Sequence, residues 1–345
     1  MALAALLLVP AAARAQTRPI RIGVLYWSMN IPGQVAMRQG LEAEAKAINA
    51  AAKASGAPTV VLETKVAGDG EAGITAQIRQ MSDFVAGGVK LIIVQPTDNA
   101  ALAPPLKAAN RAGIPVVAYD QYISGGKLAA YRSSDNYMAG YFDGEYIASL
   151  FPDDREIRVV LVEYPNVSST VERVDGFIDA LVASRQRYKI LASFRAVEPI
   201  GGAKAAADLL AAFPAKGSVD VVFTVNDGGG LALAKALYEA GRAEILHATI
   251  DGDPASVDNI TQGRLTVIDS AQFCGPLGAE AMKAAYAILR GQPAPFHALV
   301  PVFPITKETL NRYPGWMGPL PADFKKPWPS ANPAWSGALR VVKDK

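Results

Sequence analysis

The feature that most constrains the fold is a regular alternation, from residue 19 onwards, of short Val- and Ile-rich runs with longer helical patterns. The apolar runs have the length and composition of strands that are buried on both faces. Between them, apolar residues recur at helical spacing, as in Ile74, Ile78, Met81 and Val85, which fall on one helix face. This alternation is typical of α/β domains with helices on both faces of parallel sheets. The expected strands are residues 20–26, 59–66, 91–95, 115–119, 157–163, 220–225, 247–250 and 265–268.

Composition excludes several classes of function. The 345 residues include two histidines and one cysteine, Cys274, so no internal disulfide and no multi-cysteine metal site is possible. A formal net charge of +2 gives none of the basic surface that nucleic acid requires. The GxGxxG pattern at residues 68–73 follows the second expected strand, and its Asp69 and Glu71 would repel a pyrophosphate. We therefore expect no cofactor, no metal site and no catalytic residues.

Residues 1–15 are expected to be a signal peptide. A short apolar run ends at Pro10, and Ala13-Arg14-Ala15 fits the small-x-small cleavage pattern. The run is too short to span a bilayer, and the absence of a cysteine at the cleavage point excludes a lipid anchor. No Lys or Arg precedes the run, which leaves open a start upstream of Met1 or an alanine-rich terminal segment. The expectation is a soluble protein exported from the cytoplasm.

Polar residues at the ends of four expected strands repeat one spacing. Gln95 and Asp120 stand 25 residues apart, and so do Asn226 and Asp251, with 131 residues between Gln95 and Asn226. Matching halves predict two similar α/β lobes. Because ligands bind beyond the carboxyl ends of parallel strands, the four side chains are expected to line one cleft between the lobes. The alternative, that each is an ordinary turn residue, stays open.

A series of short motifs connects these positions to a known family. They are IRIGVLYWSMNIP, LIIVQPTDNAAL, IPVVAYDQ, SSDN, ERVDGF, FTVNDGGGLAL, ATIDGDP and the AQ that ends at Gln272. In this order and spacing they resemble the type I periplasmic binding proteins of the ribose and galactose class, which serve ABC importers. The resemblance covers about residues 19–310. It implies two similar Rossmann-like lobes joined by a hinge that the chain crosses three times.

The resemblance also implies domain boundaries. The N-terminal lobe would hold residues 19–122 and 268–298, and the C-terminal lobe residues 123–267 and 299–311. Residues 312–345 lie outside the pattern. This extension is rich in proline and holds three of the four tryptophans, so we expect it to pack against a lobe or the hinge.

Carried over position by position, the family's ligand contacts fall on nine residues. They are Trp27, Gln95, Asp120, Ser134, Asn136, Arg173, Asn226, Asp251 and Gln272. Each aspartate accepts two hydroxyl hydrogen bonds, and Arg173 offers a fork of donors. Two aspartates against one arginine disfavour an anionic ligand.

Two departures from the family's pattern bear on the ligand. Residues 31–34 lack the aromatic rings that sugar receptors of this class commonly place after the first strand. Gln121 stands where an arginine often follows the first aspartate. A neutral polyol or an unusual sugar therefore fits better than a flat sugar held between two rings.

The expected function is that of a monomeric, periplasmic solute-binding protein without enzymatic activity. It would capture a small neutral sugar or polyol and deliver it to a membrane ABC permease. Two alternatives stay open: a receptor that presents its ligand to a sensor kinase or chemoreceptor, and an exported enzyme on a similar fold.

Overall fold

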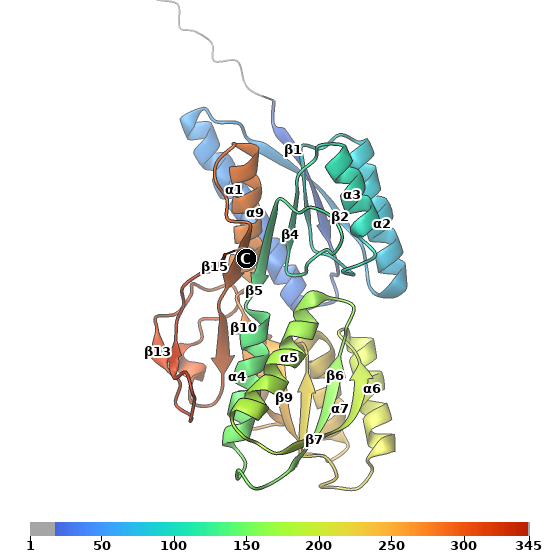
Figure 1. The fold of residues 1–345 in the computed structure, drawn as a ribbon, viewed down its shortest axis with the longest axis vertical. Helices are drawn as coiled ribbons and strands as arrows, with labels where there is room; N and C mark the ends of the chain where they lie inside the picture. Colours follow the sequence, from blue (N-terminus) through green and yellow to red (C-terminus); the bar gives the residue numbers. More distant parts are fainter. Residues whose placement is uncertain (1–17, 344–345) are drawn as a thin grey trace, which may run out of the picture.

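Two parallel sheets, each covered by helices on both faces, form two lobes that lie one above the other in Figure 1. The computed structural model describes residues 18–343, so the expected signal peptide lies outside the described residues. The predicted α/β fold with two similar lobes is confirmed. Within residues 18–343, no helix combines the length and apolar character that a membrane span requires.

The first lobe is built on a seven-stranded sheet in the order β15-β11-β5-β4-β3-β1-β2. Helices α1 (Pro32–Ser55) and α9 (Cys274–Leu289) pack on one face, and α2 (Gly70–Ala86) and α3 (Ala103–Arg111) on the other. Only β15 runs antiparallel to its neighbour. The strands are β1 (Ile20–Tyr26), β2 (Val60–Val66), β3 (Leu91–Val94), β4 (Val116–Tyr119), β5 (Ala130–Ser134), β11 (His297–Val300) and β15 (Arg340–Val342).

The second lobe is built on a six-stranded sheet in the order β12-β10-β9-β8-β6-β7. One face is covered by α4 (Asn136–Ser149) and α5 (Ser168–Ala183), and the other by α6 (Pro199–Ala212) and α7 (Asp227–Glu239), with α8 (Pro254–Thr261) beside α7. The strands are β6 (Ile157–Glu163), β7 (Tyr188–Arg195), β8 (Val221–Thr224), β9 (Leu246–Asp251), β10 (Thr266–Gln272) and the antiparallel β12 (Val302–Ile305).

The chain crosses between the lobes at three hinge positions, which differ from the boundaries expected from the sequence. The crossings lie at Asp135, at Phe273 and at Pro301. The expected changes of lobe after residues 122, 267 and 298 fall too early, because β5 still belongs to the first sheet and β10 continues to Gln272 in the second. Strand β5 escapes the sequence pattern because Arg132, Ser133 and Ser134 replace the usual Val and Ile.

The C-terminal extension packs along the hinge and crosses it once more. Trp335 is buried and donates its Nε1–H to the carbonyl of Val302 at 2.6 Å, beside the third crossing. Beyond it, β15 joins the edge of β11 in the first lobe. Arg340, at the start of β15, forms an ion pair of 2.6 Å with Asp135 at the first crossing. The expected packing of this segment against lobe and hinge is thus confirmed for the part of it that the structure describes.

A buried polar contact anchors the middle of the extension to α4 of the second lobe. Glu145 accepts hydrogen bonds from the Nζ of Lys326 at 2.6 Å, the Nε1 of Trp328 at 3.0 Å and the Oγ of Ser330 at 2.6 Å. Both charged side chains are almost fully buried, so removal of either one would leave the other without a partner.

Candidate functional site

A narrow cavity of about 20 Å³ lies between the lobes, at the carboxyl ends of the parallel strands. Its walls come from both lobes, as expected for a ligand site in paired α/β sheets. Six of the nine residues expected from the sequence line it: Trp27, Asp120, Arg173, Asn226, Asp251 and Gln272. The other lining residues are Ile31, Gly33, Gln34, Met37, Gln121, Val167, Ser169, Thr170 and Val197.

The remaining three expected residues lie behind the cavity wall. Gln95 donates from Nε2 to Asp120 Oδ2 at 2.9 Å, and Asn136 accepts at Oδ1 from Arg173 Nε at 3.0 Å. Both therefore support residues that line the cavity. Ser134 is buried and its Oγ has no hydrogen-bond partner, but it does not reach the cavity.

Asp120 is held at the end of β4 in a strained backbone conformation. Its φ is +66°, a left-handed value that costs a non-glycine residue about 1–3 kcal/mol. Its Oδ2 accepts from the amides of Gln95 at 2.9 Å and Gln121 at 3.0 Å, whereas its buried Oδ1 has no partner. Burial raises the pKa of Asp120 against the opposing effects of Arg173 and the two amides. The strain and the unpaired oxygen make this carboxylate a candidate for ligand binding.

Asp251 takes the corresponding place in the second lobe, at the end of β9. Its φ is +137°, again outside the range that most residues adopt. Its Oδ1 accepts from Gln272 Nε2 at 2.7 Å and from Arg173 Nη1 at 3.2 Å. Burial raises the pKa of Asp251 to about 6 despite the neighbouring guanidinium of Arg173. The two lobes thus present two carboxylates whose charged forms are both disfavoured by burial.

Arg173 reaches the strand ends because α4 and α5 approach each other closely. A Cβ added to Gly140 on α4 would lie 1.8 Å from the carbonyl oxygen of Arg173, so only glycine permits this packing. The guanidinium is almost fully buried and also donates from Nη1 to the carbonyl of Val225 at 2.7 Å. Arg173 is therefore fixed from three sides: by Asn136, by Val225 and by Asp251.

Asn226 lines the cavity, but its polar atoms are used within the protein. It is the N-cap of α7, where its Oδ1 accepts from the backbone N–H of Gly229 at 3.2 Å. Its Nδ2 donates to the carbonyl of Val197 at 3.0 Å. For this residue, the interpretation as a turn or capping residue agrees with its contacts.

Two buried acceptor atoms in the cavity wall lack partners: Asp120 Oδ1 and Gln272 Oε1. A buried polar atom without a hydrogen bond costs about 1–3 kcal/mol. Asp120 belongs to the first lobe and Gln272 ends β10 of the second. A molecule that donates hydrogen bonds to both would relieve both costs and bridge the lobes.

The rest of the wall is largely apolar. Ile31, Met37, Val167 and Val197 line it together with Trp27, whose ring centroid lies 6.4 Å from that of Tyr164. Trp27 is the one aromatic residue among the described residues that line the cavity. Tyr26, Tyr119, Tyr122, Tyr164 and Phe273 do not line it.

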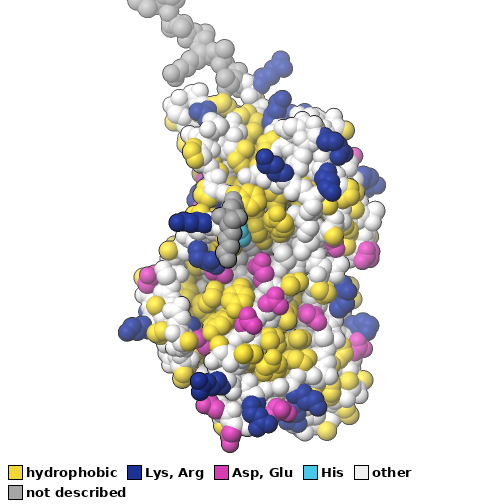
Figure 2. All heavy atoms as spheres, in the orientation of Figure 1, with side chains coloured by type: hydrophobic (Ala, Val, Ile, Leu, Met, Phe, Trp, Pro, Cys, Tyr) yellow, Lys and Arg dark blue, Asp and Glu magenta, His cyan; other side chains and the backbone are white. Residues whose placement is uncertain are grey.

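The lobes touch each other around the cavity, so the structure shows a closed arrangement. The backbone N–H of Asn99 donates to the carbonyl of Asn166 at 3.0 Å, and the N–H of Tyr122 donates to Ser168 Oγ at 2.9 Å. Glu198 accepts from the N–H of Gly70 at 3.2 Å. Figure 2 shows Asp and Glu side chains gathered on the second lobe just below this junction, with Lys and Arg mostly towards the outer ends.

Sequence reasoning missed several lining residues, notably Gln121, Ser169 and Gly33. Gln121 was noted only as a departure from the family's pattern. Ser169 begins a helix in a stretch without a motif, and its place in the wall depends on how the lobes close. Gly33 lies close to the second aspartate, because a Cβ there would be in ordinary contact with Asp251 Oδ2, at 3.8 Å.

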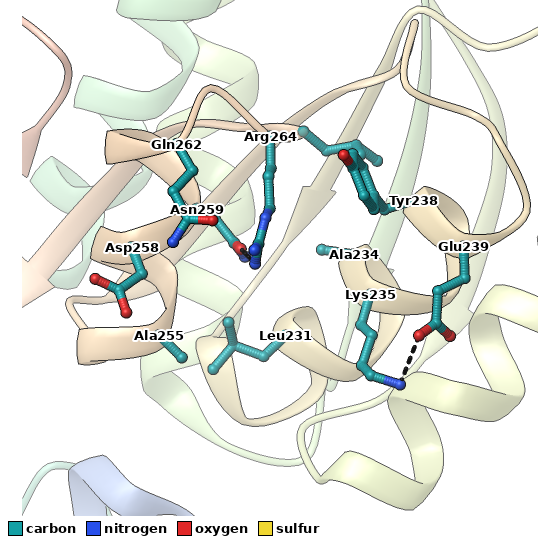
Figure 3. A pocket seen from close by; sticks show the side chains of 11 residues that line it. Leu231, Ala234, Lys235, Tyr238, Glu239, Ala255, Asp258, Asn259, Gln262 and Arg264 are labelled. Atoms are coloured by element: carbon teal, nitrogen blue, oxygen red, sulfur yellow. Dashed lines mark hydrogen bonds and ion pairs between the residues drawn. The ribbon is translucent and has the colours of Figure 1, made fainter.

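A larger groove of about 590 Å³ lies elsewhere, between α7 and α8 on the outside of the second lobe (Figure 3). Among its side chains, Lys235 and Glu239 form an ion pair of 2.9 Å along α7, and Arg264 lies 5.9 Å from the centre of the Tyr238 ring. None of the described side chains that line it has a buried polar atom without a partner. The groove also belongs to one lobe only, so the cavity between the lobes is the better candidate.

Comparisons with known proteins show which family the chain is similar to. The family model described as a periplasmic binding protein domain matches residues 22–293. The ribose import binding protein of Escherichia coli strain K12 is 28% identical over 272 residues, which cover 79% of this chain and 85% of that protein.

Two solved structures share the fold. The Caulobacter myo-inositol binding protein, solved with myo-inositol, is 25% identical with a TM-score of 0.71, covering 88% of this chain and 97% of that one. A periplasmic solute-binding protein from Actinobacillus succinogenes, solved with D-allose, is 24% identical with a TM-score of 0.71, covering 86% and 100%.

Proposed function

This chain belongs to the periplasmic binding protein domain family, and from that premise we propose that it captures a small neutral sugar or polyol between its lobes and delivers it to an ABC permease. The observation that carries the proposal is the pair of buried, unpaired acceptors, Asp120 Oδ1 and Gln272 Oε1, in the cavity wall. Catalysis forms no part of the proposed function, because the relatives are binding proteins.

Hydroxyl groups are the ligand groups that best satisfy these acceptors. Each O–H donates one hydrogen bond, and a polyhydroxylated molecule carries several at short spacing. The second carboxylate, Asp251, has Oδ1 engaged by Arg173 and Gln272, which orients the group towards the cavity. The nine expected positions thus divide into residues that would contact the ligand and residues, such as Gln95 and Asn136, that would hold those contacts in place.

A neutral ligand fits the charges of the cavity. Asp120 and Asp251 face one arginine, so a phosphate or carboxylate brought into the cavity would add a third negative group. Each additional buried anion without its own cation is costly. The apolar part of the wall, which includes Ile31, Val167 and Val197, suits the carbon skeleton of a small sugar or polyol.

Closure of the two lobes would couple ligand binding to transport. A ligand that bonds to Asp120 in one lobe and Gln272 in the other favours the closed arrangement over the open one. We propose that the protein works as a periplasmic monomer, exported by cleavage after Ala15 and recognised by the permease in this closed state.

A thermal-shift panel tests the proposal. D-ribose, D-allose, xylitol and myo-inositol form the neutral set, and D-ribose 5-phosphate and D-ribonate form the anionic set. At a concentration of 100 Kd, a ligand of the folded state adds about 2.7 kcal/mol to stability, which is a clear rise in Tm. We expect at least one neutral compound to give such a rise. A phosphate or carboxylate compound as the strongest stabiliser would overturn the assignment.

A further inference from the structure

The side chain of Gln121 connects a cavity carboxylate of one lobe to the opposite lobe. Gln121 follows Asp120 directly in the chain and is buried. Its Nε2 donates to Asp120 Oδ2 at 3.0 Å, and its Oε1 accepts from Ser169 Oγ at 2.5 Å. Ser169 belongs to α5 of the second lobe and is also buried. The bridge therefore runs Ser169 to Gln121 to Asp120, from the second lobe into the first.

The bridge needs an amide at position 121. It requires a donor towards the carboxylate and an acceptor towards the serine hydroxyl, and a side-chain amide supplies both. An arginine, which often occupies this position in the family, has no acceptor for Ser169. Gln121 and Ser169 are therefore complementary: the amide oxygen of Gln121 accepts the hydrogen bond that the hydroxyl of Ser169 donates.

Helix α5 contacts both aspartates of the cavity. Ser169 and Arg173 lie four residues apart on α5 and so share one face of the helix. Arg173 bonds to Asp251 directly at 3.2 Å, and Ser169 bonds to Asp120 through Gln121. When the second lobe swings away, α5 moves with it; of these two contacts, the one to Asp120 crosses the cleft and the one to Asp251 does not.

We propose that Gln121 and Ser169 are positioning residues that fix the Asp120 carboxylate, with Oδ1 free for the ligand, only while the lobes are closed. This inference rests on the proposed function of the cavity. In the open state Ser169 is withdrawn, and Asp120 keeps only the two amide bonds from its own lobe. The bridge therefore slows the release of ligand from the closed state and leaves its entry into the open state unchanged.

The neighbouring Ser168 provides a matched control. Its Oγ accepts from the backbone N–H of Tyr122 at 2.9 Å, so it also forms one hydrogen bond across the cleft. Ser168 makes this bond with the backbone of Tyr122 and not with the carboxylate of Asp120. Loss of either serine hydroxyl weakens closure, but only Ser169 acts through Asp120.

The kinetic test measures association and dissociation rates by stopped-flow fluorescence for wild type, Ser169→Ala and Ser168→Ala, each with and without Asp120→Asn. The probe is the strongest stabiliser among D-ribose, D-allose, xylitol and myo-inositol. One neutral hydrogen bond corresponds to about 0.5–1.5 kcal/mol, or roughly a 2- to 12-fold change in rate. We expect Ser169→Ala to speed dissociation by this factor with an unchanged association rate.

The Asp120→Asn background separates the proposed bridge from a general closure contact. We expect the effect of Ser169→Ala to shrink to less than half in that background, while the effect of Ser168→Ala stays the same. Equal, additive effects of the two serines would overturn the proposal. So would a Ser169→Ala effect confined to the association rate.

A ligand-free measurement keeps this inference distinct from the assignment of the ligand. Cysteines at 121 and 169 should be joined by a short bis-thiol reagent whenever the lobes close, because the native side chains touch there. Cysteines at 121 and 171 form the control, because Val171 lies on the same helix with 40% of its surface exposed. Failure of the first pair to cross-link faster than the second would refute the bridge even if none of the four compounds binds.

Discussion

Replacing Asp120 by Asn separates ligand binding from folding. The substitution keeps the shape of the side chain and removes a buried charge. The amide oxygen can accept from Gln95 and Gln121, which now donate to Oδ2 at 2.9 and 3.0 Å. The amide nitrogen then takes the place of Oδ1, the atom without a partner. A ligand hydroxyl that donates to Oδ1 in the wild type meets a second donor in the variant.

The contacts of Asp120 give the size and sign of the effects on ligand affinity and on the stability of the ligand-free protein. A mismatched buried donor costs about 1–3 kcal/mol, which weakens affinity roughly 5- to 150-fold. The stability of the ligand-free protein changes in the opposite direction or not at all. Burial raises the pKa of Asp120, so the folded protein already disfavours the charge that the substitution removes.

Calorimetric titration and thermal melting measure the two quantities on the same samples. The titrations use the strongest stabiliser of the neutral panel. Asp83→Asn is the control, because Asp83 is an exposed aspartate on α2 paired with Lys65, and its loss should alter neither quantity. Wild-type affinity in Asp120→Asn, or a lower Tm of the ligand-free variant with affinity intact, would refute this reasoning.

Three further predictions concern the second aspartate, pH and export. Asp251→Asn should leave the stability of the ligand-free protein unchanged or raise it in urea unfolding at pH 7, because burial already disfavours the charge that the substitution removes and Arg173 still faces Asp120; a lower midpoint would contradict this reasoning. Because the pKa of Asp251 is raised to about 6, the folded protein binds this proton more tightly than the unfolded chain does. The stability of the ligand-free protein should therefore rise as the pH falls from about 6 towards 4. Ligand affinity, measured by titration, should fall roughly tenfold at pH 5, because the ligand then meets a protonated Asp251. An affinity that stays constant from pH 7 to 5 would contradict this. Protein from the native cell envelope should begin at Gln16 by mass spectrometry, and an intact Met1 on that material would contradict the export proposal.

Most of the fold was predictable because buried parallel strands leave a strong sequence signal. Strands such as β3 (Leu91–Val94) and β8 (Val221–Thr224) are buried along their whole length and appear as unbroken apolar runs. Two of the strands that were missed, β5 and β7, lack this signal. Strand β7 (Tyr188–Arg195) is an edge strand with alternating exposure, and β5 carries arginine and serines. The hinge boundaries were placed too early for the same reason.

The candidate site was predictable where a residue's role follows from its place at a strand end. Asp120 and Asp251 end strands β4 and β9, and both line the cavity with positive φ values that no sequence pattern reveals. Gln95 and Asn136 also end or begin elements, but they point to partners within the protein. Whether such a residue faces the ligand or supports one that does depends on side-chain direction. The role of Ser169 could not be predicted from the sequence, because its contact with Gln121 exists only when the two lobes meet.

Strand β15 has a consequence for the order in which the molecule is completed. It covers one edge of β11, whose other edge pairs with β5, so the first sheet joins strands from residues 20 to 342. The first lobe therefore lacks its outer strand until residues 340–342 have been synthesised, and until then β11 presents an open edge. Contacts so distant in sequence also form slowly. Under the proposed export, this arrangement delays completion of the lobe until residues 340–342 have crossed the membrane.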